Sequence, residues 1–138
     1  MKIQALIVSL CTLLPGIPAV ADAGNAAAAP GAYPIDAALS KTEEGEWLFK
    51  SFPDGSRLYT YEGDNPGQSN CNDGCAAAWP PLFVSRENAE SVGQWTVIVR
   101  EDSRKQWAYK GMPVYRRYHD IPSKTEQYKL EGFLLLTP

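Results

Sequence analysis

Short runs of alternating aromatic and polar residues dominate the chain from residue 46 onward. Residues 47–52 (WLFKSF) and 57–61 (RLYTY) flank a Pro-Asp-Gly turn, and residues 94–99 (QWTVIV) and 105–109 (KQWAY) flank a charged connection. Aromatic and β-branched residues on both sides of a turn favour antiparallel pairing. The pattern therefore predicts two β-hairpins.

Three further segments extend this plan. Residues 113–118 and 133–136 are further strand candidates. Residues 37–44 instead predict a turn or two of helix, because Asp36 stands where a helix cap is preferred. The chain is thus expected to be mainly β.

The cysteine loop is expected to carry one short helix. Residues 73–79 (DGCAAAW) are small and begin with Asp73, which we expect to cap the helix. Pro80 and Pro81 follow directly and end it.

The chain also repeats itself at a spacing of 56 residues. The order Gly-x-x-aliphatic-Tyr-x-x-x-x-Asp-x-Pro occurs at residues 55–66 and again at residues 111–122. Repeated supersecondary units commonly build a shared core. We therefore expect a small single domain of two related halves, each containing a β-hairpin.

The first 21 residues have the pattern of a signal peptide. Lys2 precedes an apolar run at residues 3–14, and small residues stand at the two positions that signal peptidase reads. That run is shorter than the roughly 20 residues needed to cross a bilayer, so we expect no transmembrane segment in the mature chain. Residues 22–34, rich in Ala, Gly and Pro, predict a flexible leader before a folded domain at 35–138. The protein is expected to be periplasmic or secreted.

Charge argues against nucleic acid as a partner. The chain has 13 Lys and Arg against 16 Asp and Glu. Proteins that bind phosphate backbones usually show a basic patch. The densest basic cluster here is only Arg116 and Arg117, with Lys110 nearby.

Removal of the signal peptide also removes Cys11, so the mature chain contains two cysteines. An even pair in an exported chain predicts a disulfide between Cys71 and Cys75. A bridge over so short a loop removes less unfolded-state entropy than the roughly 3 kcal/mol expected for 15 residues, so it would shape the loop. The alternative is a redox-active pair, or a metal site with His119, although three soft ligands fall one short of a closed zinc site.

Several strings resemble the landmarks of a known family. In order along the chain they are residues 59–64 (YTYEGD), 66–71 (PGQSNC), 75–82 (CAAAWPPL) and 105–115 (KQWAYKGMPVY). They resemble bacterial secreted or lipid-anchored repeat proteins with a Tyr-x-aromatic-x-x-Asp motif, whose function is unknown. The second copy departs from this family, because Arg117 stands where an aromatic residue is expected.

The motif aspartates are expected to be structural. Asp64 and its repeat equivalent Asp120 lie in Pro-containing turn sequences. An aspartate in such a turn usually accepts hydrogen bonds from backbone amides. The alternative is a paired carboxylate site between the two repeats.

The motif tyrosines and the tryptophans are expected in the core. Alternation along a strand sends Tyr59 and Tyr61 to one face, and Tyr115 is the repeat equivalent of Tyr59. The alternatives are an aromatic binding ledge and a route for electrons. Large buried area makes core packing the expected role of three tryptophans as well, namely Trp79, Trp95 and Trp107.

Signatures of catalysis are missing from the sequence. It contains no glycine-flanked nucleophilic serine, no His-Glu-x-x-His string and no phosphate-binding glycine loop. We therefore expect no cofactor and no enzymatic activity. The sequence predicts a noncatalytic cell-envelope domain, a binding or structural module for an unidentified envelope ligand or protein.

Overall fold

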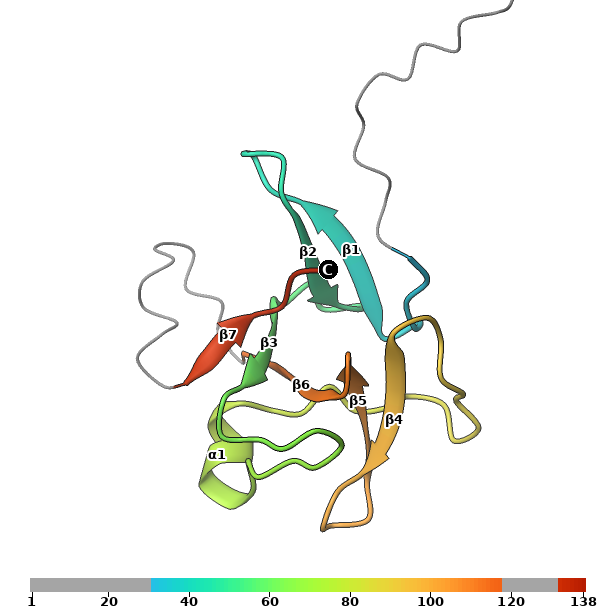
Figure 1. Cartoon of the computed structure of the whole chain (residues 1–138), viewed down its shortest axis with the longest axis vertical. Coiled ribbons are helices and arrows are strands. Elements are labelled where there is room, and N and C mark those ends of the chain that lie inside the picture. Colours follow the sequence, from blue (N-terminus) through green and yellow to red (C-terminus); the bar gives the residue numbers. More distant parts are fainter. Residues whose placement is uncertain (1–30, 118–131) are drawn as a thin grey trace, which may run out of the picture.

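The structure, a computed structural model, describes residues 31–117 and 132–138 (Figure 1). Over these residues the elements are β1 (Ala37–Lys41), β2 (Trp47–Ser51), β3 (Leu58–Tyr61), α1 (Asp73–Ala78), β4 (Trp95–Val99), β5 (Lys105–Tyr109), β6 (Met112–Arg116) and β7 (Phe133–Leu135). The predicted fold class, mainly β with one short helix at the cysteine loop, is confirmed. The predicted signal peptide, most of the leader, His119 and Asp120 lie outside the described residues.

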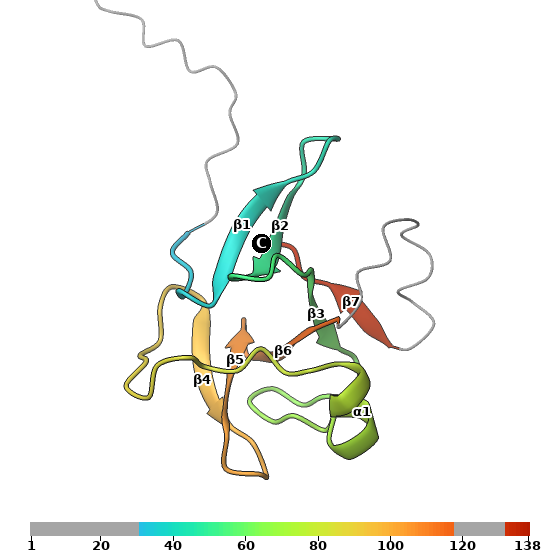
Figure 2. The same ribbon diagram turned by 180° about the vertical axis from the view of Figure 1, so that it is seen from behind.

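The strands form two antiparallel sheets. One contains β1 and β2, and the other has the order β4-β5-β6-β3-β7. Figures 1 and 2 show the two-stranded sheet at one end of the domain and α1 at the other. The cysteine loop therefore lies far from the β1–β2 hairpin.

The helix predicted over residues 37–44 is wrong. Residues 37–41 form β1, which pairs with β2 from Ala37 opposite Ser51 to Lys41 opposite Trp47. This pairing buries Ala37 in the core, and burial outweighs the local helical preference of the segment. Asp36 caps no helix.

The hairpins predicted from the sequence had different outcomes. The second is confirmed, since β4 and β5 pair along their full length. The first is wrong, because β2 pairs with β1 and meets the β3 side only at a bridge between Lys50 and Arg57. The turn before β2 explains why β2 pairs with β1. Gly45 has a φ of 89°, which allows residues 42–46 to form a tight turn that brings β1 beside β2.

Helix α1 begins one residue earlier than its predicted cap implies. The N-cap is Asn72 and makes no side-chain capping hydrogen bond, while Asp73 is already helix residue one. Asn72 is otherwise engaged, because its Oδ1 accepts a hydrogen bond from Nη2 of Arg100 at 3.0 Å. The predicted role of Asp73 is therefore wrong.

The duplication is visible in the strand registers. Shifting the β1–β2 register by 58 positions, from Ala37 to Trp95, reproduces the β4–β5 register at all five residue pairs. The turns agree as well, since the N–H of Thr42 donates to the carbonyl of Glu46 and the N–H of Arg100 to that of Arg104. We define unit 1 as residues 34–84 and unit 2 as residues 92–138.

The two units meet across a local twofold axis. Strands β3 and β6 pair with Tyr59 directly opposite Tyr115, its equivalent 56 positions later. The pairs on either side, Leu58 with Arg116 and Thr60 with Val114, exchange places under the same relation. The axis therefore passes between the two motif tyrosines.

Each unit ends in a segment that lies on the other unit. Leu82 closes unit 1 and Leu136 closes unit 2, and each bonds to the strands of its neighbour. The hydrogen bonds run from Leu82 N to Val114 O, Trp107 N to Leu82 O, Leu136 N to Leu58 O and Phe49 N to Leu136 O. The units thus exchange their closing segments.

Two clusters of buried side chains form the core of the described residues. The larger contains equivalent residues from both units, including Phe49 with Trp107 and Leu82 with Leu136. The smaller lies at the twofold axis and contains Tyr59, Cys71, Trp79, Tyr115 and Phe133. This smaller cluster supports the cysteine loop.

Candidate functional site

The cysteine loop is closed by a disulfide. Cys71 and Cys75 are bonded, with their Cα atoms 5.2 Å apart. Cys71 has no exposed surface and packs among the aromatic rings of the smaller cluster, whereas Cys75 is half-buried. Because both sulfurs are in the disulfide, neither is available in this form as a thiolate ligand for a metal.

Asp64 holds the loop that leads to the cysteines. Its Oδ1 accepts a hydrogen bond from the N–H of Asn70 at 2.7 Å, and Asn70 Nδ2 donates to the carbonyl of Gly63 at 2.8 Å. Its Oδ2 accepts a hydrogen bond from the hydroxyl of Tyr115, also at 2.7 Å. The aspartate thus bonds a backbone amide in its own unit and a tyrosine of the other unit.

Ser69 extends this contact. Its Oγ lies 2.7 Å from the Tyr115 hydroxyl and accepts a hydrogen bond from Nη1 of Arg100 at 2.7 Å. Because the Tyr115 hydroxyl donates to Asp64, the proton between the two hydroxyls belongs to Ser69. The chain of donors therefore runs from Arg100 through Ser69 and Tyr115 to Asp64.

Arg100 is the centre of the network and is only 5% exposed. Nη1 also donates to Oε1 of Gln106 at 2.7 Å, and Nη2 donates to the carbonyl of Cys71 at 2.8 Å and to Asn72. The Nε atom lies 3.8 Å from a carboxylate oxygen of Asp102. The buried guanidinium is tolerated because the four acceptors on Nη1 and Nη2 replace most of its hydration, while Nε has only the charge of Asp102 nearby.

Sequence reasoning missed Arg100 by placing it in the hairpin connection. A signal was present, because Ile98 and Arg100 are two positions apart and a continued strand would point both side chains to one face. Ile98 is buried, so alternation places the arginine on the inner side. The contact of Tyr115 with Asp64 was also missed, because the motif was read within one repeat.

Burial raises the pKa of both acidic groups of the network, Asp64 and Tyr115. Burial raises the pKa of the Asp64 carboxyl, although the Asn70 N–H, the Tyr115 hydroxyl and the Arg100 charge oppose the shift. Burial also raises the pKa of the Tyr115 phenol, and the adjacent Asp64 adds to the rise. Tyr115 therefore stays protonated and remains a donor.

The tryptophans singled out in the sequence lie in the interior. Trp79, Trp95 and Trp107 are all buried, as is Tyr59, while Tyr61 is half-buried. Trp107 Nε1 donates to Oδ2 of Asp36 at 2.8 Å, and the N–H of Ser85 donates to the same oxygen at 3.1 Å. Asp36 therefore ties the start of unit 1 to unit 2.

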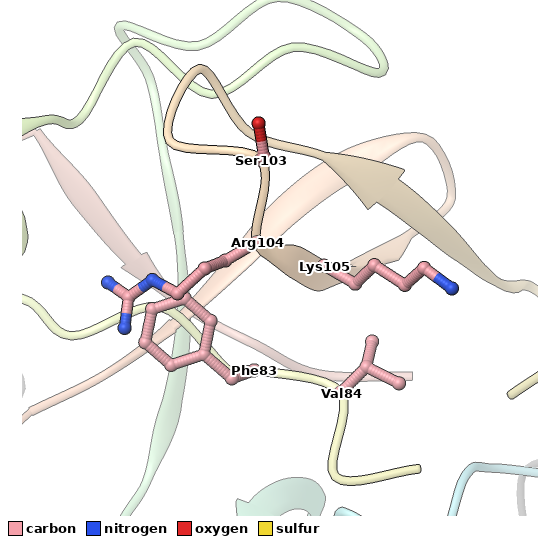
Figure 3. Close-up of a pocket in the computed structure, with 5 residues that line it drawn as sticks. All are labelled: Phe83, Val84, Ser103, Arg104 and Lys105. Carbon is pink, nitrogen blue, oxygen red and sulfur yellow. The ribbon is translucent and has the colours of Figure 1, made fainter. Parts of the chain in front are cut away.

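The surface around the network is shallow. An open depression of about 600 Å³ lies between α1 and the β4–β5 turn, lined by Asn72, Asp73, Ala76, Ala77, Arg100, Glu101, Asp102 and Arg104. A second, of about 460 Å³, lies beside the same turn, where the Arg104 guanidinium covers the Phe83 ring at 3.9 Å from its centroid (Figure 3). Both depressions are open to solvent.

The part of the chain that the structure describes contains no preformed metal site. No group of three or more His, Cys, Asp or Glu side chains there is arranged to hold an ion. His119 and Asp120, which the sequence offered as a metal ligand and a paired carboxylate, lie outside residues 31–117 and 132–138. What the described network can do chemically is fix a loop.

Comparison with known proteins gives a match to one family model over part of the chain. Residues 52–82 match the family model described as a secreted repeat of unknown function. Neither the curated proteins nor the solved structures contain a match to the chain. The matched segment lies wholly in unit 1 and runs from the residue after β2 to Leu82. Within residues 31–117 and 132–138, no helix has the length and apolar character needed to span a membrane.

Proposed function

We propose that this chain, whose residues 52–82 match a secreted-repeat family, is an exported noncatalytic module of the cell envelope. It acts in the periplasm or outside the cell as a binding or structural module. The observation that carries the proposal is the way in which the disulfide, Arg100 and Asp64 hold one another and fix the cysteine loop.

The reactive groups of the network are used for structure. Asp64 accepts two hydrogen bonds, and Tyr115 is buried and held as a donor. The Arg100 guanidinium donates four hydrogen bonds to unit 1 and to Gln106. Substrate would have to displace these partners before any of the three groups could act on it.

The surface offered to an envelope ligand or protein is the outer side of this loop. Helix α1 has no fully buried residue, so it contributes mainly surface, and of its six residues Cys75 packs against the smaller core cluster. Together with the β4–β5 turn it borders the larger depression. We propose that the disulfide keeps this surface in one conformation and so lowers the entropy lost on binding.

Redox titration of the oxidised protein tests the proposal. Native protein is equilibrated with dithiol buffers, alkylated, and weighed as intact protein by mass spectrometry. We expect both cysteines to resist alkylation until the potential falls below about −300 mV, the range of structural disulfides. The matched control is the Cys71→Ser and Cys75→Ser double variant, which should show no added mass at any potential.

A redox-active pair is the second candidate, because Cys75 is half-buried and can be reached by an attacking thiolate. It requires a midpoint well above −300 mV, near the values of disulfide exchange proteins. Binding of one zinc ion per reduced chain, lost in the His119→Ala variant, would instead support a metal site. Either result would reject the structural role of the disulfide.

A further inference from the structure

The contacts between the two units are of the kind that fold a single domain. Strand β3 of unit 1 pairs with β6 of unit 2, and the segment ending at each unit's closing leucine lies on the opposite unit. Without unit 2, β3 would lose both of its neighbours in the five-stranded sheet, β6 and β7. One unit alone therefore leaves open strand edges and an uncovered core.

The polar contacts between the units are buried and specific. Tyr115 of unit 2 donates to Asp64 of unit 1, and Arg100 of unit 2 donates to Ser69, Cys71 and Asn72 of unit 1. The residues of the tyrosine-aspartate pattern thus bond between repeats, with the tyrosine in one and the aspartate in the other. A wrong partner would leave these groups buried and unsatisfied.

The covalent connection contributes much less. Residues 85–91 join the units, and all of them are exposed except Ala89, which is half-buried. The backbone of Ser85 donates to Asp36, and the carbonyl of Glu87 accepts a hydrogen bond from Lys105. These are single hydrogen bonds, whereas the units are joined directly by paired strands, β3 with β6 and β7.

We infer that each unit is a pairing module whose partner is the other unit, either of the same chain or of a second copy of this chain, and that the two units recognise each other without the connection at 85–91. The surface is the one made by β3 or β6 and the closing segments, with the Tyr115–Asp64 contact selecting the partner. Two chains could then exchange whole units and assemble as an intertwined dimer. This inference is independent of the proposed function.

Cutting the connection in the folded protein tests this inference. Residues 87–90 are replaced by the recognition sequence of a specific protease, the folded chain is cut, and its mass is measured by light scattering after gel filtration. We expect both pieces to elute together at the mass of the uncut chain. After separation in denaturant they should reassemble one to one, and an excess of tagged unit 2 should exchange into the complex.

A double variant and a control variant show whether the buried contact selects the partner. Asp64→Asn with Tyr115→Phe removes the contact between units, and we expect reassembly to weaken by about tenfold or more. Thr42→Ala is the control, because Thr42 Oγ1 accepts a hydrogen bond from the N–H of Glu46 within its own unit. Separation of the cut pieces in native buffer, or equal reassembly of all variants, would overturn the inference.

A circular permutant covers the case in which the protease site itself prevents folding. The connection from residue 84 to residue 92 is equivalent, under the twofold relation, to a path from residue 138 to residue 34. A chain opened at 85–91 and joined through that path by seven residues should fold with the wild-type disulfide and near-ultraviolet spectrum. Failure of the permutant to fold would reject the inference that the two units recognise each other without the connection at 85–91.

Discussion

Trp79 and Phe133 stack with their ring centroids 3.9 Å apart and their planes 7° from parallel. They are equivalent residues of the two units, since each lies three positions before its unit's closing leucine. Tyr59 meets Trp79 edge-on at 5.1 Å, and Tyr115 meets Phe133 edge-on at 5.5 Å. The smaller core cluster is therefore built from equivalent aromatic pairs around the twofold axis.

Truncation of this stack should be among the most destabilising changes in the chain. Phe133→Ala and Trp79→Ala each leave a cavity at the axis, and we expect a loss of about 3–5 kcal/mol in the free energy of unfolding. Urea denaturation measures this loss. Val99→Ala is the control, because Val99 is 67% exposed and its truncation should change stability by no more than about 0.5 kcal/mol. Equal midpoints for Phe133→Ala and the control would contradict the packing role.

Arg117 takes part in the same stack. Tyr61 stacks on Phe133 at 4.6 Å, and the guanidinium of Arg117, 56 positions later, lies over Trp79 at 5.1 Å. Arginine can replace the aromatic residue expected there because its planar guanidinium stacks on a ring. The departure seen in the sequence is thus a substitution of one planar group by another.

The variants Arg117→Tyr and Arg117→Lys distinguish stacking from charge. We expect Arg117→Tyr to keep the wild-type melting temperature, because it restores an aromatic ring at the equivalent of Tyr61. Arg117→Lys keeps the charge but loses the planar contact, and should cost about 0.5–1 kcal/mol. Differential scanning calorimetry measures both. Greater stability of the lysine variant than of the tyrosine variant would show that charge is the important property.

Strand existence could be predicted from the sequence more easily than strand partners. The β4–β5 pair was found because both strands alternate clearly around one connection. The partner of β2 was missed because alternation shows which face a strand buries but not which neighbour it bonds. The helix prediction over residues 37–44 rests on Asp36 as a local cap, and the pairing of residues 37–41 with β2 overrides that local preference.

The candidate site could be predicted in part for a similar reason. The disulfide follows from two cysteines in an exported chain, and the bond of Asp64 to a backbone amide follows from its turn. The bonds of Asp64 to Tyr115 and of Arg100 to the cysteine loop join residues 51 and 29 positions apart. Such contacts depend on the twofold arrangement of the units, which composition and local spacing do not determine.

Arg100 should be far more important for stability than its neighbour Arg104. Arg100→Met removes the guanidinium donor from three buried acceptors, on Ser69, Gln106 and Cys71, so we expect a loss of about 3 kcal/mol or more. Arg104→Met is the matched control, because its side chain is 60% exposed and its salt bridge with Asp102 lies at the surface. Chemical denaturation compares the two. A larger loss for Arg104→Met would show that the network is not the main support of the loop.

Asp64 and Asp54 should titrate on opposite sides of the ordinary aspartate pKa of 3.8. Burial raises the pKa of Asp64, so its contribution to stability is complete below 3.8 and is lost as the pH rises through its folded value. Burial also acts to raise the pKa of Asp54, but bonds from Ser51 and Ser56 and the Arg116 charge outweigh it and lower the pKa.

The contribution of Asp54 is therefore present above pH 3.8 and is lost as the pH falls through its folded value. Carbon-13 NMR of the side-chain carboxyls measures both titrations in the folded protein. Asp64→Asn and Asp54→Asn assign the two resonances. A midpoint for Asp64 at or below that of Asp54 would contradict the burial of the Asp64 carboxyl.

Gly63 is required by the ring of Tyr61. A Cβ atom at residue 63 would clash with Cε1 of that ring, so the ring or the backbone would have to shift. The ring cannot move away freely, because Phe133 stacks on it at 4.6 Å. We expect Gly63→Ala to displace the ring and cost about 1–3 kcal/mol in unfolding free energy.

Gly74→Ala is the matched control, because a Cβ atom in α1 at residue 74 meets nothing within 4 Å and alanine favours the helix. Thermal denaturation should therefore give a lower melting temperature for Gly63→Ala and an equal or higher one for Gly74→Ala, whereas equal shifts would place Tyr61 outside the stack in solution.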